Sequence, residues 1–147
     1  MSLLAEQLDA LLYNETDQIA NLANASALLN EALADVNWVG FYLYHEQTDE
    51  LVLGPFQGKV ACMHIKNGQG VCGTALKQQK CLRIANVHEF KGHIACDSAS
   101  NSELVIPLFK GERPFGVLDI DSPSFDRFTA EDEATLCEFA QTLMKHL

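Results

Sequence analysis

The stretch ELVIPLFKGERPFGVLDID (residues 103–121) consists of two strand-like runs joined by a turn at Lys110-Gly111-Glu112. Residues 103–109 and 115–121 both alternate in polarity, which predicts an antiparallel hairpin. Successive side chains of a strand point to opposite faces, so the aliphatic residues gather on one face. The other face then carries three carboxylates, Glu103, Asp119 and Asp121. If that face is exposed to solvent, the carboxylates reflect only the amphipathic character of the strands. If it is covered, they form a candidate site.

A second strand is expected at NWVGFYLY (37–44), which is rich in aromatic and β-branched residues. Its alternation places Trp38, Gly40 and Tyr42 on the same face. Two aromatic side chains flanking a glycine leave a hollow between them. This face is either half-buried aromatic packing or two walls of a small-molecule pocket.

The rest of the chain predicts further strands and several helices around these two features. Apolar residues recur at helical spacing in residues 3–12 and 16–34, which predicts two scaffold helices. The last helix is expected at 130–145, where Thr129 and Asp132 frame a capping box. Shorter strands are expected at 51–56, 58–66 and 80–85, and a helix at 71–79. Residues 86–102 lack periodicity, and a loop of that length is typically functional.

Composition limits the classes of partner. The 147 residues include 48% hydrophobic residues, which is typical of one globular domain. The formal net charge of −10 disfavours nucleic acid and anionic membranes as partners, because their phosphates attract basic surfaces. The start of the chain has no positive segment and carries Glu6 and Asp9 within its apolar residues, so no secretory signal is expected. We therefore expect a cytoplasmic protein.

Five cysteines raise the question of thiol chemistry. A static disulfide framework is not expected in a reducing compartment, which leaves catalysis, metal binding or burial. Cys62, Cys72 and Cys96 lie among glycine and polar residues. Cys81 and Cys137 lie among apolar residues and are interpreted as structural. Cys72 is expected in the first turn of its helix, where the helix dipole favours a thiolate and lowers the thiol pKa.

Three other chemistries fit these residues less well than thiol redox chemistry. Zinc could use Cys62 with His64, or His93 with Cys96, but the chain lacks the CxxC spacing of structural zinc sites. No Lys-Ser/Thr pair follows the glycine-rich loop 67–70, so it is not a phosphate-binding P-loop. A Cys/His hydrolase would need a base, which His64, His88 or His93 could supply, but no matching signature is present. Redox chemistry needs an attacking thiolate, a second thiol and an external reductant.

The order of motifs resembles a known family. The runs GQGVCGTA (68–75), IANV (84–87), SELVIPL (102–108), FGVLDIDS (115–122) and FTAED (128–132) look like a GAF domain. The runs NWVGFY (37–42), GPFQGKVAC (54–62), GVCG (70–73) and HIACD (93–97) resemble, more narrowly, the free methionine-(R)-sulfoxide reductases. The resemblance covers the chain from about residue 10 onward. Cys81 and Cys137 are additional to its pattern.

The resemblance implies an α+β fold. A single GAF domain is expected over residues 1–147, with helices in 1–36 and the sheet core, pocket loops and last helix in 37–147. Its six-stranded antiparallel sheet would carry helices on one side and a ligand pocket under loops on the other.

The resemblance also implies an oxidoreductase that reduces free methionine-(R)-sulfoxide. Cys96 is expected to attack the sulfoxide sulfur, while Glu103 and Asp121 bind and protonate its oxygen. The resulting sulfenic acid would condense with Cys62 or Cys72 to form a disulfide.

By the same resemblance, Trp38 and Tyr42 would line the slot for the S-methyl group, and Asp119 would help to hold the substrate. No bound metal or cofactor is expected. Thioredoxin, kept reduced by NADPH and thioredoxin reductase, would be the external reductant.

Two alternatives from other classes remain open. A GAF module could bind a small molecule such as a cyclic nucleotide without catalysis, although its phosphate would face the three acids. A zinc-stabilised interaction protein would bind near-stoichiometric zinc through the cysteines. The sequence does not fix the oligomeric state, and a homodimer is compatible with it.

Overall fold

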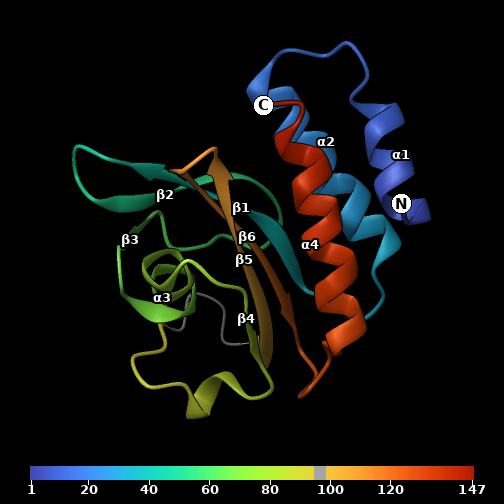
Figure 1. The fold of residues 1–147 in the computed structure, drawn as a ribbon. Helices are drawn as coiled ribbons and strands as arrows, with labels where there is room; N and C mark the ends of the chain where they lie inside the picture. Colours follow the sequence, from blue (N-terminus) through green and yellow to red (C-terminus); the bar gives the residue numbers. More distant parts are fainter. Residues whose placement is uncertain (95–98) are drawn as a thin grey trace.

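The computed structural model describes residues 1–94 and 99–147 and has helices on both sides of one sheet (Figure 1). In chain order the elements are α1 (Leu3–Leu11), α2 (Gln18–Ala32), β1 (Trp38–His45), β2 (Glu50–Gly58), β3 (His64–Lys66), α3 (Gly70–Gln78), β4 (Leu82–Ile84), a 3-10 turn η1 (Val87–Glu89), β5 (Ser102–Lys110), β6 (Arg113–Ser122) and α4 (Ala130–Met144).

The six strands form one antiparallel sheet in the order β3-β2-β1-β6-β5-β4. The predicted hairpin is therefore β5–β6, and it lies inside the sheet, with β1 beside β6. This confirms the expected α+β architecture. Among the described residues, no helix is both long and apolar enough to cross a membrane.

The larger core lies between the sheet and the helices α1, α2 and α4, which Figure 1 shows together on one side. Leu104, Ile106 and Leu108 of β5 point into it, as do Leu118 and Ile120 of β6. All five are 3% exposed or less, so the aliphatic face of the hairpin is covered as its alternation predicts. The predicted capping box begins α4, since the Thr129 side chain accepts from the Asp132 backbone.

A smaller core covers the opposite face of the sheet, where α3 packs against β5 and β6. Its buried members are Trp38, Tyr42, Leu51, Ile65, Val71, Cys72, Ala75, Leu76, Val105 and Val117. Both faces of the hairpin are therefore covered, and the carboxylates of β5 and β6 do not lie on a solvated face.

The three strands expected at 51–56, 58–66 and 80–85 all differ in length from those expectations, and β4 covers only Leu82–Ile84, which leaves Cys81 just before it. β3 covers only His64–Lys66, so Cys62 lies in the irregular segment before it rather than in the predicted strand 58–66. β2 covers Glu50–Gly58 and so runs beyond the predicted strand 51–56, through Gly54 and Pro55. Proline is tolerated there because β3 pairs with β2 only at residues 50–52, which leaves the outer side of Pro55 without a strand partner.

Candidate active site

The three predicted carboxylates gather on the covered face of the sheet. Glu103 pairs with Asp121 across β5 and β6, and Asp121 pairs with Trp38 across β6 and β1. Asp119 lies one step along the same face of β6, opposite Gly40. Glu103, Asp119 and Asp121 are 7%, 5% and 9% exposed. The expected acid cluster is therefore present and buried.

The aromatic wall of the site comes from β1 and β2. The rings of Trp38 and Tyr42 stack at 5.8 Å between centroids, and Phe56 stacks on Trp38 at 5.1 Å. Trp38 and Tyr42 line the pocket as expected, but Gly40 has another role than leaving a hollow. A Cβ on Gly40 would collide with the Cβ of Phe56, so the glycine lets β2 approach and bring Phe56 behind Trp38.

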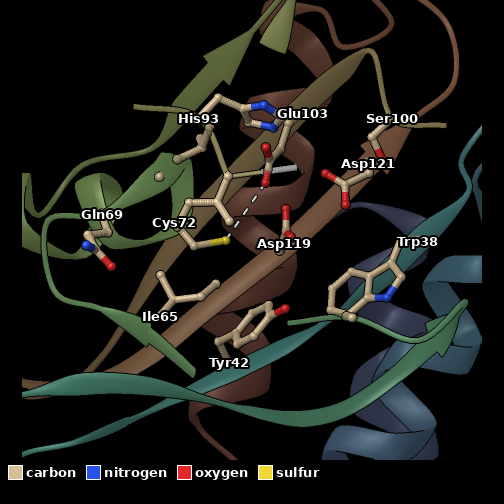
Figure 2. A pocket seen from close by; sticks show the side chains of 14 residues that line it. Trp38, Tyr42, Ile65, Gln69, Cys72, His93, Ser100, Glu103, Asp119 and Asp121 are labelled. Carbon is tan, nitrogen blue, oxygen red and sulfur yellow. Dashed lines mark hydrogen bonds between the residues drawn. The ribbon is translucent and has the colours of Figure 1, made fainter. Parts of the chain in front are cut away.

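These groups surround a small cavity of about 40 Å³ (Figure 2). Figure 2 shows Glu103, Asp119 and Asp121 converging from one side, with Trp38, Tyr42 and Cys72 around them. The lining residues are Trp38, Tyr42, Ala61, Ile65, Gln69, Gly70, Val71, Cys72, His93, Ile94, Ser100, Glu103, Asp119 and Asp121. The strands, α3 and the loop before β5 therefore contribute together.

Cys72 differs from the expectation of a thiol activated by its helix. It lies in the first turn of α3 as predicted, but it is only 5% exposed, and its Sγ lies 3.8 Å from Oε2 of Glu103. Burial raises the pKa of the Cys72 thiol well above its usual range, and the charges of Asp119 and Glu103 raise it further. The lowered pKa was therefore a wrong prediction, because desolvation and nearby acids outweigh the helix dipole.

Burial favours the protonated form of two of these carboxyl groups, Glu103 most strongly. Burial raises the pKa of Glu103 well above its usual range, and the charges of Asp119 and Asp121 raise it further. Burial also raises the pKa of Asp119, although hydrogen bonds with Glu103 and Cys72 oppose that rise. Glu103 is thus the member of the cluster that retains a proton. Among residues 1–94 and 99–147, the buried Oδ1 of Asp119 has no hydrogen-bond partner, so the cluster can accept a further donor.

Tyr42 links the aromatic wall to Cys62. Its hydroxyl donates to the backbone carbonyl of Cys62 at 2.9 Å. Burial and the nearby charge of Asp119 raise the pKa of Tyr42, which keeps the hydroxyl protonated as a donor. Cys62 is disulfide-bonded, whereas Cys72, Cys81 and Cys137 are free. Cys96, the predicted nucleophile, lies outside the residues that the structure describes.

Of the two cysteine–histidine pairs considered for zinc, only Cys62 with His64 lies wholly within the described residues, and these two do not form a ligand pair. Cys62 is in a disulfide, and the exposed His64 lies 3.1 Å from Glu50. Within residues 1–94 and 99–147, one group brings three potential ligand atoms together: Cys72, Glu103 and Asp119 lie within 4.8 Å of one another. These are the buried groups of the pocket itself, and a small cation or an ammonium group would suit their charge.

Sequence reasoning missed several residues of the pocket. Gln69, Ile94 and Ser100 line it from loops, where no periodicity indicates which way a side chain points. His93 was considered only as a base or ligand, but it lines this cavity, and burial lowers its pKa. Phe56 was expected only as a strand residue. Its apolar character beside Gly54-Pro55 was the available signal.

Comparison with known proteins finds similarity over nearly the whole chain. A family model described as GAF domain matches residues 7–147. The free methionine-R-sulfoxide reductase of Escherichia coli is 55% identical over 144 residues, which cover 98% of this chain and 86% of that protein.

Solved structures give the same result. The fRMsr of Staphylococcus aureus in its reduced form is 50% identical, with a TM-score of 0.94 over 99% of this chain and 93% of that one. The free methionine-R-sulfoxide reductase of Neisseria meningitidis, solved in complex with its substrate, is 45% identical. Its TM-score is also 0.94, over 97% of this chain and 85% of that one.

Proposed function

Because the chain belongs to the GAF-domain family and, within it, to the free methionine-R-sulfoxide reductases, we propose that it reduces free L-methionine-(R)-sulfoxide to L-methionine. Membership of this family makes the protein an oxidoreductase. The substrate is proposed from the named relatives, one of which was solved with its own substrate.

The observation that carries the proposal is the buried acid cluster facing an aromatic wall across a small cavity. A free amino acid brings an ammonium group, which can neutralise buried carboxylates, and Asp119 has an oxygen without a partner. A methionine residue inside a peptide lacks that ammonium. We propose that Asp119 helps to hold the substrate and that Trp38 and Tyr42 enclose its S-methyl end.

The acids also suit the proton requirement of sulfoxide reduction. We assign binding and protonation of the sulfoxide oxygen to Glu103 and Asp121. The raised pKa of Glu103 favours its protonated form, which supports a role as proton donor. Asp121 is directly opposite Glu103 on the neighbouring strand, which supports a shared role for the two carboxyl groups.

The proposed electron transfer balances in two steps. The Cys96 thiolate attacks the sulfoxide sulfur while an acid gives one proton to the sulfoxide oxygen, and the transient bond between the two sulfurs then breaks as the hydroxyl passes to the cysteine, which becomes a sulfenic acid. The S–O bond of the substrate breaks, methionine leaves, and the cysteine is oxidised by two electrons. The thiolate of a second cysteine then attacks the sulfenic sulfur, an S–S bond forms, the S–O bond breaks, and the departing hydroxide takes one proton from solvent or an acid to leave as water.

Cys62 is favoured over Cys72 as the second thiol. Cys62 is disulfide-bonded, whereas Cys72 is a free, buried thiol. The raised pKa of Cys72 also leaves little thiolate at neutral pH. We propose that Cys72 contributes to the polarity of the pocket through its contact with Glu103.

We propose thioredoxin as the reductant of the disulfide, itself reduced by NADPH and thioredoxin reductase, in the cytoplasm. The surroundings of Cys62 support access by a reducing protein. Val60 and Met63, on either side of it, are 89% and 68% exposed. Exposed apolar side chains next to a disulfide offer a contact surface.

The decisive test is NADPH consumption with thioredoxin and its reductase. The R and S epimers of free methionine sulfoxide are compared with a peptide that contains methionine sulfoxide. Turnover is expected with the free R epimer alone. Equal turnover of all three, or none, would overturn the proposal.

A serine series tests the roles of the cysteines. Cys96→Ser should abolish both turnover and single-turnover release of methionine. Cys62→Ser should release about one methionine per enzyme and then stop, because the sulfenic acid is not resolved. Cys72→Ser should retain single-turnover release. Loss of that release in Cys72→Ser would identify Cys72 as the attacker instead.

A ligand-binding GAF module without catalysis is the alternative function, and the comparisons do not favour it. The phosphate of a cyclic nucleotide would meet Glu103, Asp119 and Asp121 in the cavity, which is a like-charge contact. Protein that binds a cyclic nucleotide and fails the coupled assay would support this alternative.

A further inference from the structure

A second pair of cysteines lies outside the pocket. Cys81 directly precedes β4, Cys137 lies on α4, and their Sγ atoms are 3.1 Å apart. Both thiols are free and half-buried, and both pack against the larger core, on the helix side of the sheet. The pocket of the proposed reaction belongs to the other face. The resemblance to the reductase family accounts for neither cysteine.

These thiols line a groove of their own with a volume of about 420 Å³. The groove is mainly apolar, with Ile106, Leu108 and Phe109 of β5 on one side and Ala140 and Met144 of α4 on the other. It shares no lining residue with the pocket near Glu103. A small uncharged oxidant can therefore reach the pair without passing through the active site.

We propose that Cys81 and Cys137 form a second redox site, a dithiol that peroxides oxidise to a disulfide between the start of β4 and α4. The Sγ–Sγ distance of 3.1 Å must shorten to about 2.05 Å, a movement of roughly 1 Å. Rotation of half-buried side chains beside a groove can supply a movement of that size.

The oxidation balances with one peroxide. One sulfur attacks the peroxide, an S–O bond forms, the O–O bond breaks, and the thiol becomes a sulfenic acid as water leaves. The second sulfur attacks the sulfenic sulfur, an S–S bond forms, the S–O bond breaks, and a second water leaves. The two thiols lose two electrons in total, and the peroxide gains them.

The surroundings of Cys81 indicate a slow first step. Burial raises its pKa to about 12, and its hydrogen bond with Cys137 and the charge of Glu133 contribute. Little thiolate is then present at neutral pH, so oxidation by low concentrations of peroxide is slow. Metal binding is the less suitable role, since no third ligand joins this pair among the described His, Cys, Asp and Glu side chains.

Peptide mapping of the wild-type protein tests the proposal directly. The reduced protein is treated with hydrogen peroxide while folded, alkylated to block remaining thiols, and digested with trypsin. Cleavage after Lys and Arg places Cys81 in the tripeptide 81–83 and Cys137 in residues 128–145. The other three cysteines fall on separate peptides. A cross-linked species of 81–83 with 128–145, lighter by two hydrogen atoms than the two peptides, is expected and should vanish with dithiothreitol.

A stability readout accompanies the map. Linking positions 56 residues apart restricts the unfolded chain, so oxidation should raise Tm by about 5–15 °C. Cys81→Ser and Cys137→Ser should each lose the cross-link and this rise. Both variants should keep methionine sulfoxide turnover near the wild-type rate, which separates this site from the proposed function.

Three results would overturn the proposal. The first is two alkylated thiols at Cys81 and Cys137 after an excess of peroxide. The second is sulfinic or sulfonic acid at either cysteine without the cross-link. The third is a cross-link that forms only in denatured protein or only between chains.

Discussion

Glu103 on β5 lies directly opposite Asp121 on β6, although both side chains are carboxylic acids and both are buried. Like charges at directly opposite positions of a sheet destabilise it. The pair is tolerated because the raised pKa of Glu103 keeps it protonated. The arrangement therefore makes the fold less stable, and in return it provides a protonated carboxyl group inside the pocket.

Glu103→Gln should make the folded protein more stable at alkaline pH. The folded carboxyl binds its proton more tightly than the unfolded one, whose pKa is about 4.3. The free energy of unfolding therefore falls as the pH rises from about 4.3 through the raised pKa of Glu103. An amide at this position removes that loss, so we expect a gain on the order of 1 kcal/mol at pH 8. Urea unfolding at pH 5 and pH 8 measures it.

Glu112→Gln is the matched control for Glu103→Gln, since Glu112 is exposed at the turn of the same hairpin. It should change neither stability nor its pH dependence. Glu103→Gln should also lower turnover by about 10²–10⁴-fold, the usual contribution of a general acid. Unchanged turnover would remove Glu103 from the reaction.

Tyr42→Phe should slow disulfide formation more than methionine release. The hydroxyl of Tyr42 holds the backbone carbonyl of Cys62, while the ring alone forms the wall of the slot. Loss of this hydrogen bond should cost about 0.5–1.5 kcal/mol of stability. Stopped single-turnover reactions, assayed for methionine and for free thiols, separate the two steps.

Tyr44→Phe provides the comparison for Tyr42→Phe. It removes a hydroxyl from the same strand, but that hydroxyl bonds to the exposed Asp49. Neither step should change in this variant. Equal slowing of both steps by Tyr42→Phe would show that the hydroxyl acts on the substrate rather than on Cys62.

Gly40→Ala should disturb the aromatic wall by a steric clash rather than by backbone strain. Its Cβ would collide with Phe56, and crowding of this kind typically costs about 1–3 kcal/mol. Trp38 is the single tryptophan, so its emission reports the wall without other signals. We expect a shifted emission spectrum and a lower Tm.

Gly111→Ala separates backbone strain from steric crowding. Gly111 has a positive φ of 63° but open space around its Cβ position. It should lower stability by roughly 1 kcal/mol and leave the emission of Trp38 unchanged. An unaltered spectrum in Gly40→Ala would show that β2 can move away without disturbing Trp38.

Asp119→Asn should weaken substrate binding by about 10–100-fold, as expected for loss of a charged partner. Titration of free methionine-(R)-sulfoxide into the Cys96→Ser background, followed by Trp38 emission, gives the dissociation constant. Asp126→Asn, on the exposed loop after β6, should bind as tightly as the parent. A ligand with a blocked amino group should not bind. Equal affinity for that ligand would refute the role given to the ammonium group.

The sequence was most informative where side chains alternate. Period-two patterns in β1, β5 and β6 predicted which residues face the pocket, because a strand in a sheet has only two faces. Trp38, Glu103 and Asp121 are cross-strand neighbours as that pattern requires. The capping box of α4 was equally local and equally predictable.

Features set by tertiary environment were less predictable. The helix position of Cys72 indicated a lowered pKa, but burial of the thiol, reinforced by acids 31 and 47 residues away in the chain, raises it instead. The approach of Cys81 to Cys137 depends on how α4 packs beside β4 and β5, which no local pattern records. Loop residues such as Ser100 have no periodicity from which an orientation could be read.

The two-sided hairpin also bears on how the chain avoids misfolding. If β6 slipped by one residue against its neighbours, Leu118 and Ile120 would turn toward the pocket, and Asp119 and Asp121 would enter the core beneath the helices. That core is built of apolar side chains, so the slipped sheet would place two acids in apolar surroundings, at a large cost in free energy. The acidic residues of the pocket thus also disfavour the wrong register of β6. Replacing them with apolar residues would make the slipped register less unfavourable, as well as remove the site.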